Sequence, residues 1–432
     1  DGLVYPDRRP HTGLLEYKNV HRPARVVSYD GNTKELKVHN YLDFTDLKDY
    51  ASVSYEVSCD GLLVDTGELP PFSVAPHSEA LVKLDVTIPR AGRTYLKLLY
   101  KSLHESPLVS AGHELGFDEI LLENEDNRNQ TAVKWLSVQK DAGEKIHVEE
   151  TDFRVKLKGE SFSYIYNKKN GLFEKTEYAG REYLDRPMEI NVWRAPTDND
   201  RYIKTEWKKA HYHEAYARAY ETTVEQSEGG IVITSRMSVS AATVQVMMKI
   251  RTVWTIDNSG GISCVMKVEK DEEFPELPRF GVRLFLCDGL EEVSYYGYGP
   301  MESYVDKHRG ASHGLFHKTV CQMHEDYIRP QENGSHFDCD YVELSGRQFG
   351  LMVTGEKRFS FNVSKYTQEE LERKNHNFEL EPIDSTVLCL DYALNGIGSN
   401  SCGPKVIEKY RFLETRFCFS FKFIPFVKET IG

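Results

Sequence analysis

The chain contains 432 residues, of which 54 are Lys or Arg and 67 are Asp or Glu, giving a net charge of −13. A chain of this length is expected to form two or three domains, each large enough to bury its own core. The acidic balance argues against the phosphate-neutralising surface that nucleic-acid binding requires, and the sequence has no run of about 18 apolar residues that could cross a bilayer. The expected partners are therefore neutral molecules or other protein surfaces, not nucleic acid or a membrane.

The eight cysteines are scattered without a C-x-x-C spacing or a nearby pair of histidines, which argues against a zinc site or a redox motif. Cys264, Cys287, Cys389 and Cys418 fall in apolar, strand-like runs, where a free thiol behaves as a small hydrophobic side chain. A disulfide framework is not expected in so long a chain. Free thiols are typical of a reducing compartment, which predicts a cytoplasmic protein.

The first twenty residues predict a turn followed by a short helix. Pro6 and Pro10 interrupt the chain, and the stretch HTGLLEYKNV then has helical composition with apolar residues at Leu14, Leu15 and Tyr17. A domain does not normally open with an isolated helix before a run of strands. Residues 1–20 are therefore interpreted as the last element of a preceding domain.

Short strands separated by turns fill residues 21–123. Six segments alternate apolar and polar residues between Asp-Gly, Gly-Asn or Pro-rich turns: ARVVSYD, KELKVHN, ASVSYEVSCDG, LLVDTGEL, EALVKLDV and TYLKLLYKS. Six or seven strands in about 100 residues predict an immunoglobulin-like sandwich. The polar, acidic stretch ENEDNRNQ that follows marks a linker, placed at residues 124–143.

Residues 144–432 again consist mainly of strand-like segments, which predicts one large β-sandwich with long inserted loops and makes the chain all-β. Asn-Gly at 170–171 and Ser-Gly-Gly at 259–261 predict hairpin turns. Helical patterns occur near residues 203–220 and 367–374. Thr367 is expected to cap the second of these helices, with Glu370 completing a capping box.

Two loops of this second region carry acidic residues that packing alone explains poorly. WRAPTDNDR places Asp198, Asn199 and Asp200 after a proline turn. A turn whose carboxylates accept backbone N–H groups and pair with arginine is the favoured interpretation, and a cation or sugar site is the alternative. GYGPMESYVD contains Glu302 and Asp306, which are interpreted as structural supports, with a functional role as the alternative.

Two further loops are rich in polar or small residues. PQENGSHFD has the densest polar cluster, with Glu332, Asn333 and His336, and a buried hydrogen-bond network is favoured over a functional site. NGIGSNSCGP, the glycine-rich loop at residues 395–404, has three glycines and small polar side chains. Such a loop builds no core but lets a backbone approach a ligand closely, so a binding role is favoured over a plain turn.

These four loops and the opening DGLVYPDRRPHTGLLEYKNV resemble, in order and spacing, the carboxy-terminal part of the large β-galactosidases of glycoside hydrolase family 2. The resemblance covers the chain from Asp1 to about Phe426. It implies the fourth and fifth domains of a five-domain enzyme, namely an immunoglobulin-like sandwich and a terminal supersandwich similar in fold to galactose mutarotase. It also implies hydrolysis of terminal β-galactosides such as lactose, with retention, by two glutamates in a preceding barrel.

A retaining glycosidase needs two carboxyl groups about 5–5.5 Å apart, which barrel enzymes mount on alternating strands and helices. No such alternation occurs here, so no catalytic residue is expected in this chain and the isolated chain should be inactive. The resemblance implies magnesium and sodium in the complete enzyme but no cofactor held by this chain alone. It implies the upstream barrel, a β-galactoside and further copies of the enzyme, as a homo-oligomer, as partners.

The resemblance implies a functional position for two individual residues. Asp1 matches the place where family members supply an Asn or Asp side chain to an active-site sodium, which requires the barrel. Cys402 matches the place where some members have a tryptophan that stacks on the sugar next to galactose, and a thiol has no aromatic face. Substrate binding is therefore expected from Ser399, Asn400, Ser401 and Cys402, with hydrogen bonds from Asn400 or Ser401 in place of stacking.

Two other functions are alternatives. A freestanding mutarotase-like isomerase would need a general base and acid, for which Glu332 and His336 are candidates. A carbohydrate-binding or assembly module would need no chemistry. The similarity of the first residues to a barrel exit favours a β-galactosidase component over an isomerase.

Overall fold

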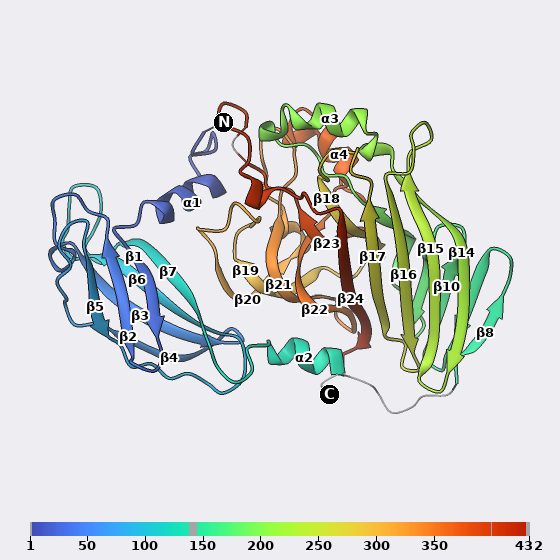
Figure 1. Ribbon diagram of the computed structural model, residues 1–432, viewed down its shortest axis with the longest axis horizontal. Coiled ribbons are helices and arrows are strands. Elements are labelled where there is room, and N and C mark those ends of the chain that lie inside the picture. Colours follow the sequence, from blue (N-terminus) through green and yellow to red (C-terminus); the bar gives the residue numbers. More distant parts are fainter. Residues whose placement is uncertain (1, 138–144, 399, 429–432) are drawn as a thin grey trace. The chain divides into compact units, whose positions relative to one another are not determined.

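The computed structural model describes residues 2–137, 145–398 and 400–428, which form two compact units (Figure 1). The first unit comprises Asp1–Val133 with the later segments Tyr298–Met301 and Lys307–Leu315. The second comprises Lys134–Gly297, Glu302–Asp306 and Phe316–Gly432.

The first unit is a seven-stranded sandwich, which confirms the immunoglobulin-like fold predicted for residues 21–123. Its two sheets have the orders β1-β2-β5 and β4-β3-β6-β7. The strands are β1 (Ala24–Asp30), β2 (Glu35–Asn40), β3 (Ala51–Cys59), β4 (Leu62–Glu68), β5 (Glu79–Lys83), β6 (Thr94–Ser102) and β7 (Glu114–Leu122). Alternate side chains enter the core, as in β6, where Leu96, Leu98 and Tyr100 are fully buried. Burial of such side chains is the main stabilising contribution.

The helix predicted near the start of the chain is confirmed as α1 (Thr12–Val20). Side-chain hydrogen bonds attach its end to β7, since Asn19 Oδ1 accepts the Phe117 N–H at 2.7 Å. Arg22 follows the helix and pairs with buried Asp118 at 2.5 Å. The helix is therefore part of the first unit and not a loose extension.

The other two sheets belong mainly to the second unit. The smaller has the order β12-β11-β10-β9-β8. Its strands are β8 (His147–Glu150), β9 (Arg154–Lys158), β10 (Phe162–Asn167), β11 (Leu172–Tyr178) and β12 (Arg181–Glu182). The main path of the larger, twelve-stranded sheet is β13-β18-β23-β22-β24-β17-β16-β15-β14, with β19, β20 and β21 joined beside it through β21 and β22.

The strands of the larger sheet are β13 (Leu184–Asn191), β14 (Tyr216–Ser227), β15 (Gly230–Ser240), β16 (Met248–Asp257), β17 (Ile262–Lys270), β18 (Arg279–Leu286), β19 (Glu292–Gly299), β20 (Ser312–Thr319), β21 (Ser335–Ser345), β22 (Phe349–Ser364), β23 (Thr386–Leu394) and β24 (Arg416–Val427). β22 pairs with β24 through its first half and with β23 through its second half. β22 is 16 residues long and so reaches both neighbours.

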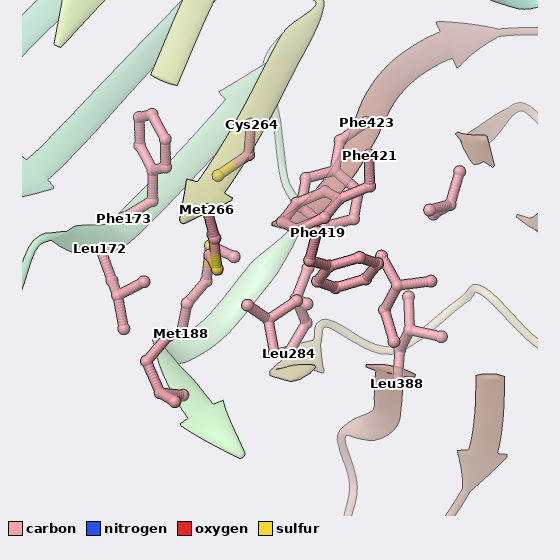
Figure 2. Packing of buried hydrophobic residues seen from close by; sticks show 14 of the residues in the cluster. Leu172, Phe173, Met188, Cys264, Met266, Leu284, Leu388, Phe419, Phe421 and Phe423 are labelled. Atoms are coloured by element: carbon pink, nitrogen blue, oxygen red, sulfur yellow. The ribbon is translucent and has the colours of Figure 1, made fainter. Parts of the chain in front are cut away.

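Aromatic and sulfur-containing side chains fill the space between the two sheets. Figure 2 shows Phe173 of the smaller sheet and Cys264, Met266 and Phe421 of the larger sheet within one buried cluster. Phe173 meets Trp254 edge to face with ring centroids 5.2 Å apart. Such contacts favour one particular packing of the core, because aromatic rings prefer defined relative orientations. The all-β class predicted from the sequence is confirmed by this architecture.

The predicted hairpin turns are confirmed, because Gly171 and Gly260 have positive φ angles of 75° and 90° between paired strands. The helix expected over residues 203–220 is mostly wrong. α3 (Ile203–Lys209) occupies only its first part, and residues 216–220 begin β14, which pairs with β15 along its length. Alternating Tyr, Ala and Arg satisfy a period of two, and pairing with a neighbouring strand decides between the two structures.

α4 (Gln368–Arg373) confirms the second predicted helix, and the Thr367 side chain accepts the Glu370 N–H at 3.2 Å as its cap. The expected capping box is wrong. The Glu370 carboxylate instead accepts the Glu381 N–H at 3.0 Å and pairs with Arg373 and Lys374. The Glu370 carboxylate therefore binds basic side chains one turn away and a loop amide, and it does not cap the start of the helix.

The region expected to be a linker, residues 124–143, contains α2 (Gln130–Ser137), and its residues 138–143 lie outside the described residues. Cys264 and Cys389 are buried, whereas Cys418 is exposed because it lies on the outward side of β24. Within the described ranges, no helix is long and apolar enough to cross a bilayer.

Candidate functional site

The glycine-rich loop begins in the second unit at the end of β23, where other loops hold its backbone. The Asp306 carboxylate accepts the N–H groups of Ile397 at 3.0 Å and Gly398 at 2.8 Å. The Asn199 side-chain amide donates to the Gly398 carbonyl, and buried Arg194 donates to the Gly396 carbonyl at 3.1 Å. Residues 395–398 are therefore fixed by side chains from two of the loops that the sequence singled out.

The structure explains why two positions of this loop are occupied by glycine. A Cβ at Gly396 would lie 2.7 Å from an Asp306 carboxylate oxygen and 3.0 Å from the Tyr410 carbonyl. Gly398 has a positive φ of 57°, a conformation that other residues seldom adopt. The glycines let the chain turn closely around Asp306.

The WRAPTDNDR loop is organised by a buried ion pair. Arg194 contacts Asp200 at 2.7 Å, and the side chains are 0% and 5% exposed. Asp200 also accepts the Thr197 N–H at 2.9 Å, and the short helix η2 (Asp198–Asp200) starts there. Asp198 is exposed. Asp200 therefore has the contacts of a turn anchor, and Asn199 has those of a clamp on the glycine-rich loop.

Backbone and side-chain hydrogen bonds join PQENGSHFD to the other loops. The Glu332 N–H donates to the Ala195 carbonyl at 3.0 Å, and Gln331 accepts the Asp198 N–H at 3.2 Å. Buried Glu302 accepts the Gly334 N–H at 2.8 Å. Residues 302–306 thus support two loops. Glu302 binds the PQENGSHFD loop, and Asp306 binds the glycine-rich loop.

Asn333 occupies the centre of PQENGSHFD and is also buried. Its side-chain oxygen accepts the Glu325 N–H at 3.0 Å, and its amide donates to the Gln331 carbonyl at 2.9 Å. Its backbone carbonyl accepts from Asn362 at 2.5 Å. A side chain with both ends engaged in this way holds the loop in shape.

A second buried ionic cluster lies beneath these loops. Arg279 pairs with Asp391 at 2.5 Å and with Glu332 at 3.2 Å, and all three side chains are at most 2% exposed. Burial raises the pKa of Glu332 to about 6, and the positive charge of Arg279 opposes this change. The second carboxylate oxygen of Glu332 accepts no hydrogen bond from the described residues.

Arg279 and Asp391 were missed from the sequence. Arg279 is one of two arginines in the otherwise apolar strand RFGVRLFL, and Asp391 is the one charged residue of TVLCLDYAL. A charge in a buried strand predicts a partner, because an unpaired buried charge is too costly. The sequence does not reveal which partner, since the two residues are 112 positions apart.

Glu332 and His336 do not form a base–acid pair in the described contacts. Glu332 is engaged by Arg279, and buried His336 packs against Tyr295 and Phe361, with ring centroids at 4.4 and 5.4 Å. This arrangement gives no support to the isomerase interpretation.

A cleft of about 370 Å³ lies beside the glycine-rich loop. Its polar lining combines amide, hydroxyl and charged groups, from Asn199, Asp200, Tyr202, Thr205, Glu206, Glu276, Asn395, Asn400, Lys405 and Arg411. Glu276 is bound by Arg411 at 2.7 Å, so these two charges compensate each other. The amide groups of the lining can donate hydrogen bonds to, and accept them from, a molecule rich in hydroxyl groups.

Of the residues predicted to bind substrate, Asn400 lines this cleft, Ser401 is half-buried and Cys402 is exposed. Ser399 and Asp1, the predicted sodium ligand, lie outside the described residues. No group of three or more His, Cys, Asp or Glu side chains is placed to hold a metal ion in the part of the chain that the structure describes.

Two family models match this chain. Residues 158–423 match the family described as β-galactosidase small chain, and residues 36–123 match β-galactosidase domain 4. The chain belongs to the β-galactosidase small-chain family.

Two curated relatives align with nearly the whole of this chain. A β-galactosidase of Actinobacillus pleuropneumoniae is 41% identical over 424 residues, covering 98% of this chain and 41% of the relative. A β-galactosidase of Staphylococcus xylosus is 34% identical over 430 residues, covering 98% of this chain and 42% of the relative. The chain thus spans about two fifths of the length of these relatives.

Among solved structures, galactose 1-epimerase from Lactobacillus acidophilus matches with a TM-score of 0.37 and 8% identity. That match covers 66% of this chain and 99% of the epimerase.

Proposed function

We propose that this chain is the part of a β-galactosidase that builds one wall of the active site through its glycine-rich loop. In this proposal a preceding barrel supplies the acid and nucleophile that cleave terminal β-galactosides with retention, together with the magnesium site. Asp1 completes a sodium site only beside that barrel. The observation that carries the proposal is the fixing of residues 395–398 by Asp306, Asn199 and Arg194.

The energetics of these contacts support a role beyond stability. A buried ion pair contributes little net stabilisation, because desolvation of its charges offsets their attraction. Arg194–Asp200 and Arg279–Asp391 are both buried. The first pair lies within a loop that holds residues 395–398, and the second reaches this group of loops through Glu332. Holding binding groups rigidly before the ligand arrives strengthens binding, because less conformational freedom is lost. The ion pairs are therefore best explained as supports for a preorganised loop.

Asn400 and Ser401 carry the binding role in this proposal. Amide and hydroxyl groups donate and accept hydrogen bonds, as sugar hydroxyls do. Cys402 is exposed and offers no stacking face. We therefore assign this part of the loop to the leaving sugar, held by hydrogen bonds.

A chimera tests the proposal. The segment of the Actinobacillus pleuropneumoniae relative that aligns with this chain is replaced by this chain, and hydrolysis of lactose and of a nitrophenyl β-galactoside is measured. The chimera should hydrolyse both, and the isolated chain neither. Changing Asn400→Ala and Ser401→Ala together should raise KM for lactose several-fold, with little effect on the nitrophenyl substrate, whose leaving group makes no sugar contacts.

Thr223→Ala with Thr255→Ala is the matched control, since these exposed residues lie on strands of the large sheet away from the loop. Activity of the isolated chain that copurifies with it would overturn the proposal. Equal KM values for the loop variant, the control and the unchanged chimera would remove the loop from the active-site wall.

A further inference from the structure

A second cleft, of about 510 Å³, lies between α3, α4 and the segment at Arg329 and Pro330. Figure 1 shows the two helices side by side. The cleft is lined by Pro196, Lys204, Thr205, Lys208, Lys209, Arg329, Pro330 and Glu372. Four cationic side chains thus face one carboxylate, in a chain whose net charge is −13.

The packing of α3 directs its basic residues into this cleft. Trp207 is fully buried and its indole N–H donates to the Glu276 carbonyl at 2.8 Å, which fixes one face of the helix against the core. Lys204 and Lys208 are four residues apart, so they lie on the same side of the helix, where like charges repel. The fold therefore holds together two cations whose mutual interaction is unfavourable.

The acidic groups nearby compensate only part of this charge. Lys208 pairs with Glu372 at 2.5 Å, and Lys209 pairs with Glu206 at 3.0 Å. Glu372 is also held by the Trp193 indole N–H at 3.1 Å. Within the described part of the chain, no ion pair is formed by Lys204 or Arg329, the two remaining cations of the lining.

The backbone that carries Arg329 is anchored on both sides. The Ile328 carbonyl accepts the Asn377 N–H at 2.9 Å, and the Arg329 carbonyl accepts from the Gln331 amide at 3.2 Å. Pro330 is buried and has a restricted backbone. The base of the Arg329 side chain is therefore fixed at the wall of the cleft opposite α3.

We propose that this cleft binds a small tetrahedral oxyanion of the phosphate or sulfate type, free or as the end group of a larger molecule. The Arg329 guanidinium offers paired N–H donors that match two oxygens of such an anion, and Lys204 supplies a compact positive charge. The Thr205 hydroxyl adds a neutral donor. The anion relieves the repulsion between Lys204 and Lys208. It also neutralises the positive charge of the cleft that Glu372 does not compensate.

Calorimetric titration of the full chain tests this proposal. Pyrophosphate, inorganic phosphate, phenyl phosphate and sulfate are titrated separately at constant ionic strength, because screening weakens such contacts. Saturable binding with one site per chain is expected, strongest for pyrophosphate. Binding of phenyl phosphate as well as phosphate would identify an end-group site, and binding of phosphate without phenyl phosphate would identify a free-anion site.

A variant with Lys204→Gln and Arg329→Gln should bind at least tenfold more weakly. The matched control is Arg251→Gln with Lys267→Gln, which removes the same charge from exposed positions on β16 and β17. Circular dichroism melts of both variants check that folding is retained, and Lys204→Arg should keep most of the affinity. Absence of saturable binding to the unchanged chain, or equal weakening in variant and control, would overturn the proposal.

Discussion

The Asp306 carboxylate accepts the Gly398 N–H at 2.8 Å, although the two residues are 92 positions apart. It accepts the Ile397 N–H as well, at 3.0 Å. One carboxylate therefore sets the direction in which the glycine-rich loop leaves β23, and it can do so only because residue 396 has no side chain.

Asp306→Asn should loosen this loop. The amide oxygen can still accept one hydrogen bond, but the negative charge that strengthened both is lost. Hydrogen bonds to charged groups contribute about 1.5–3 kcal/mol each, so unfolding in urea should show a loss of about that size. Hydrogen exchange at residues 396–398 should become faster. Asp384→Asn, at an exposed position, serves as the control, and unchanged exchange at these amides in Asp306→Asn would contradict the role assigned to the carboxylate.

Arg279→Met should be among the most destabilising single changes in the second unit. It leaves Asp391 and Glu332 buried without their cation, and breaking a buried pair in this way costs about 3–5 kcal/mol. The comparison is Arg236→Met, whose partner Glu221 is exposed and whose loss should cost less than about 1 kcal/mol. Denaturant unfolding of both variants measures the difference, and similar losses would show that the buried cluster is not strongly coupled.

Glu332 should make stability depend on pH. Its pKa rises from 4.5 to about 6 in the folded protein, because it is buried. Below about pH 4.5 the group is protonated in both states. Between pH 4.5 and 6 only the unfolded chain loses the proton, so this contribution to stability falls as pH rises.

Glu332→Gln removes the titration but keeps the shape of the side chain. The free energy of unfolding of Glu332→Gln minus that of the unchanged chain should therefore rise by about 2 kcal/mol between pH 4 and pH 7. Urea unfolding at several pH values gives this difference directly. A difference that stays flat, or falls, would show that Arg279 keeps the carboxylate ionised throughout the range.

Cys402→Trp tests the loop as part of the proposed active-site wall. An aromatic face at this exposed position could stack on the leaving sugar, with a gain of about 0.5–1.5 kcal/mol, or roughly two- to tenfold in affinity. In the chimera, inhibition by glucose should strengthen by that factor, and cleavage of the nitrophenyl substrate should change little. Cys418→Trp, at an exposed cysteine on β24, is the control. Equal glucose inhibition in both variants would withdraw the loop assignment.

Local patterns in the sequence were sufficient for much of the architecture. Alternation predicted the strands of the first unit, Asn170-Gly171 predicted a hairpin, and Thr367 predicted the start of α4. An arginine partner for the carboxylates of WRAPTDNDR was predicted, and the observed partners, Arg194 and Asp200, are six positions apart in that loop. Each of these features depends on neighbours along the chain.

Features that depend on distant residues could not be predicted in the same way. Residues 216–220 form a strand because β15 pairs with them, and their helical composition does not decide the outcome. Arg279 and Asp391 meet only after β18 and β23 have paired. Asp306 was noted as a support, but nothing local indicates that its partners are Ile397 and Gly398. The grouping of the loops follows from the order of strands in the sheet, which one sequence does not specify.

The position of β24 in the large sheet has a consequence for how the protein is made. This strand follows every other described strand in the sequence, yet it lies in the interior of the sheet between β17 and β22. While the ribosome is still adding residues before Arg416, the sheet exists as two separate halves with open edges at β17 and β22. Open edges invite pairing with other chains. A stop codon just before Arg416 would leave those halves permanently unjoined, so such a product should depend on chaperones and be degraded.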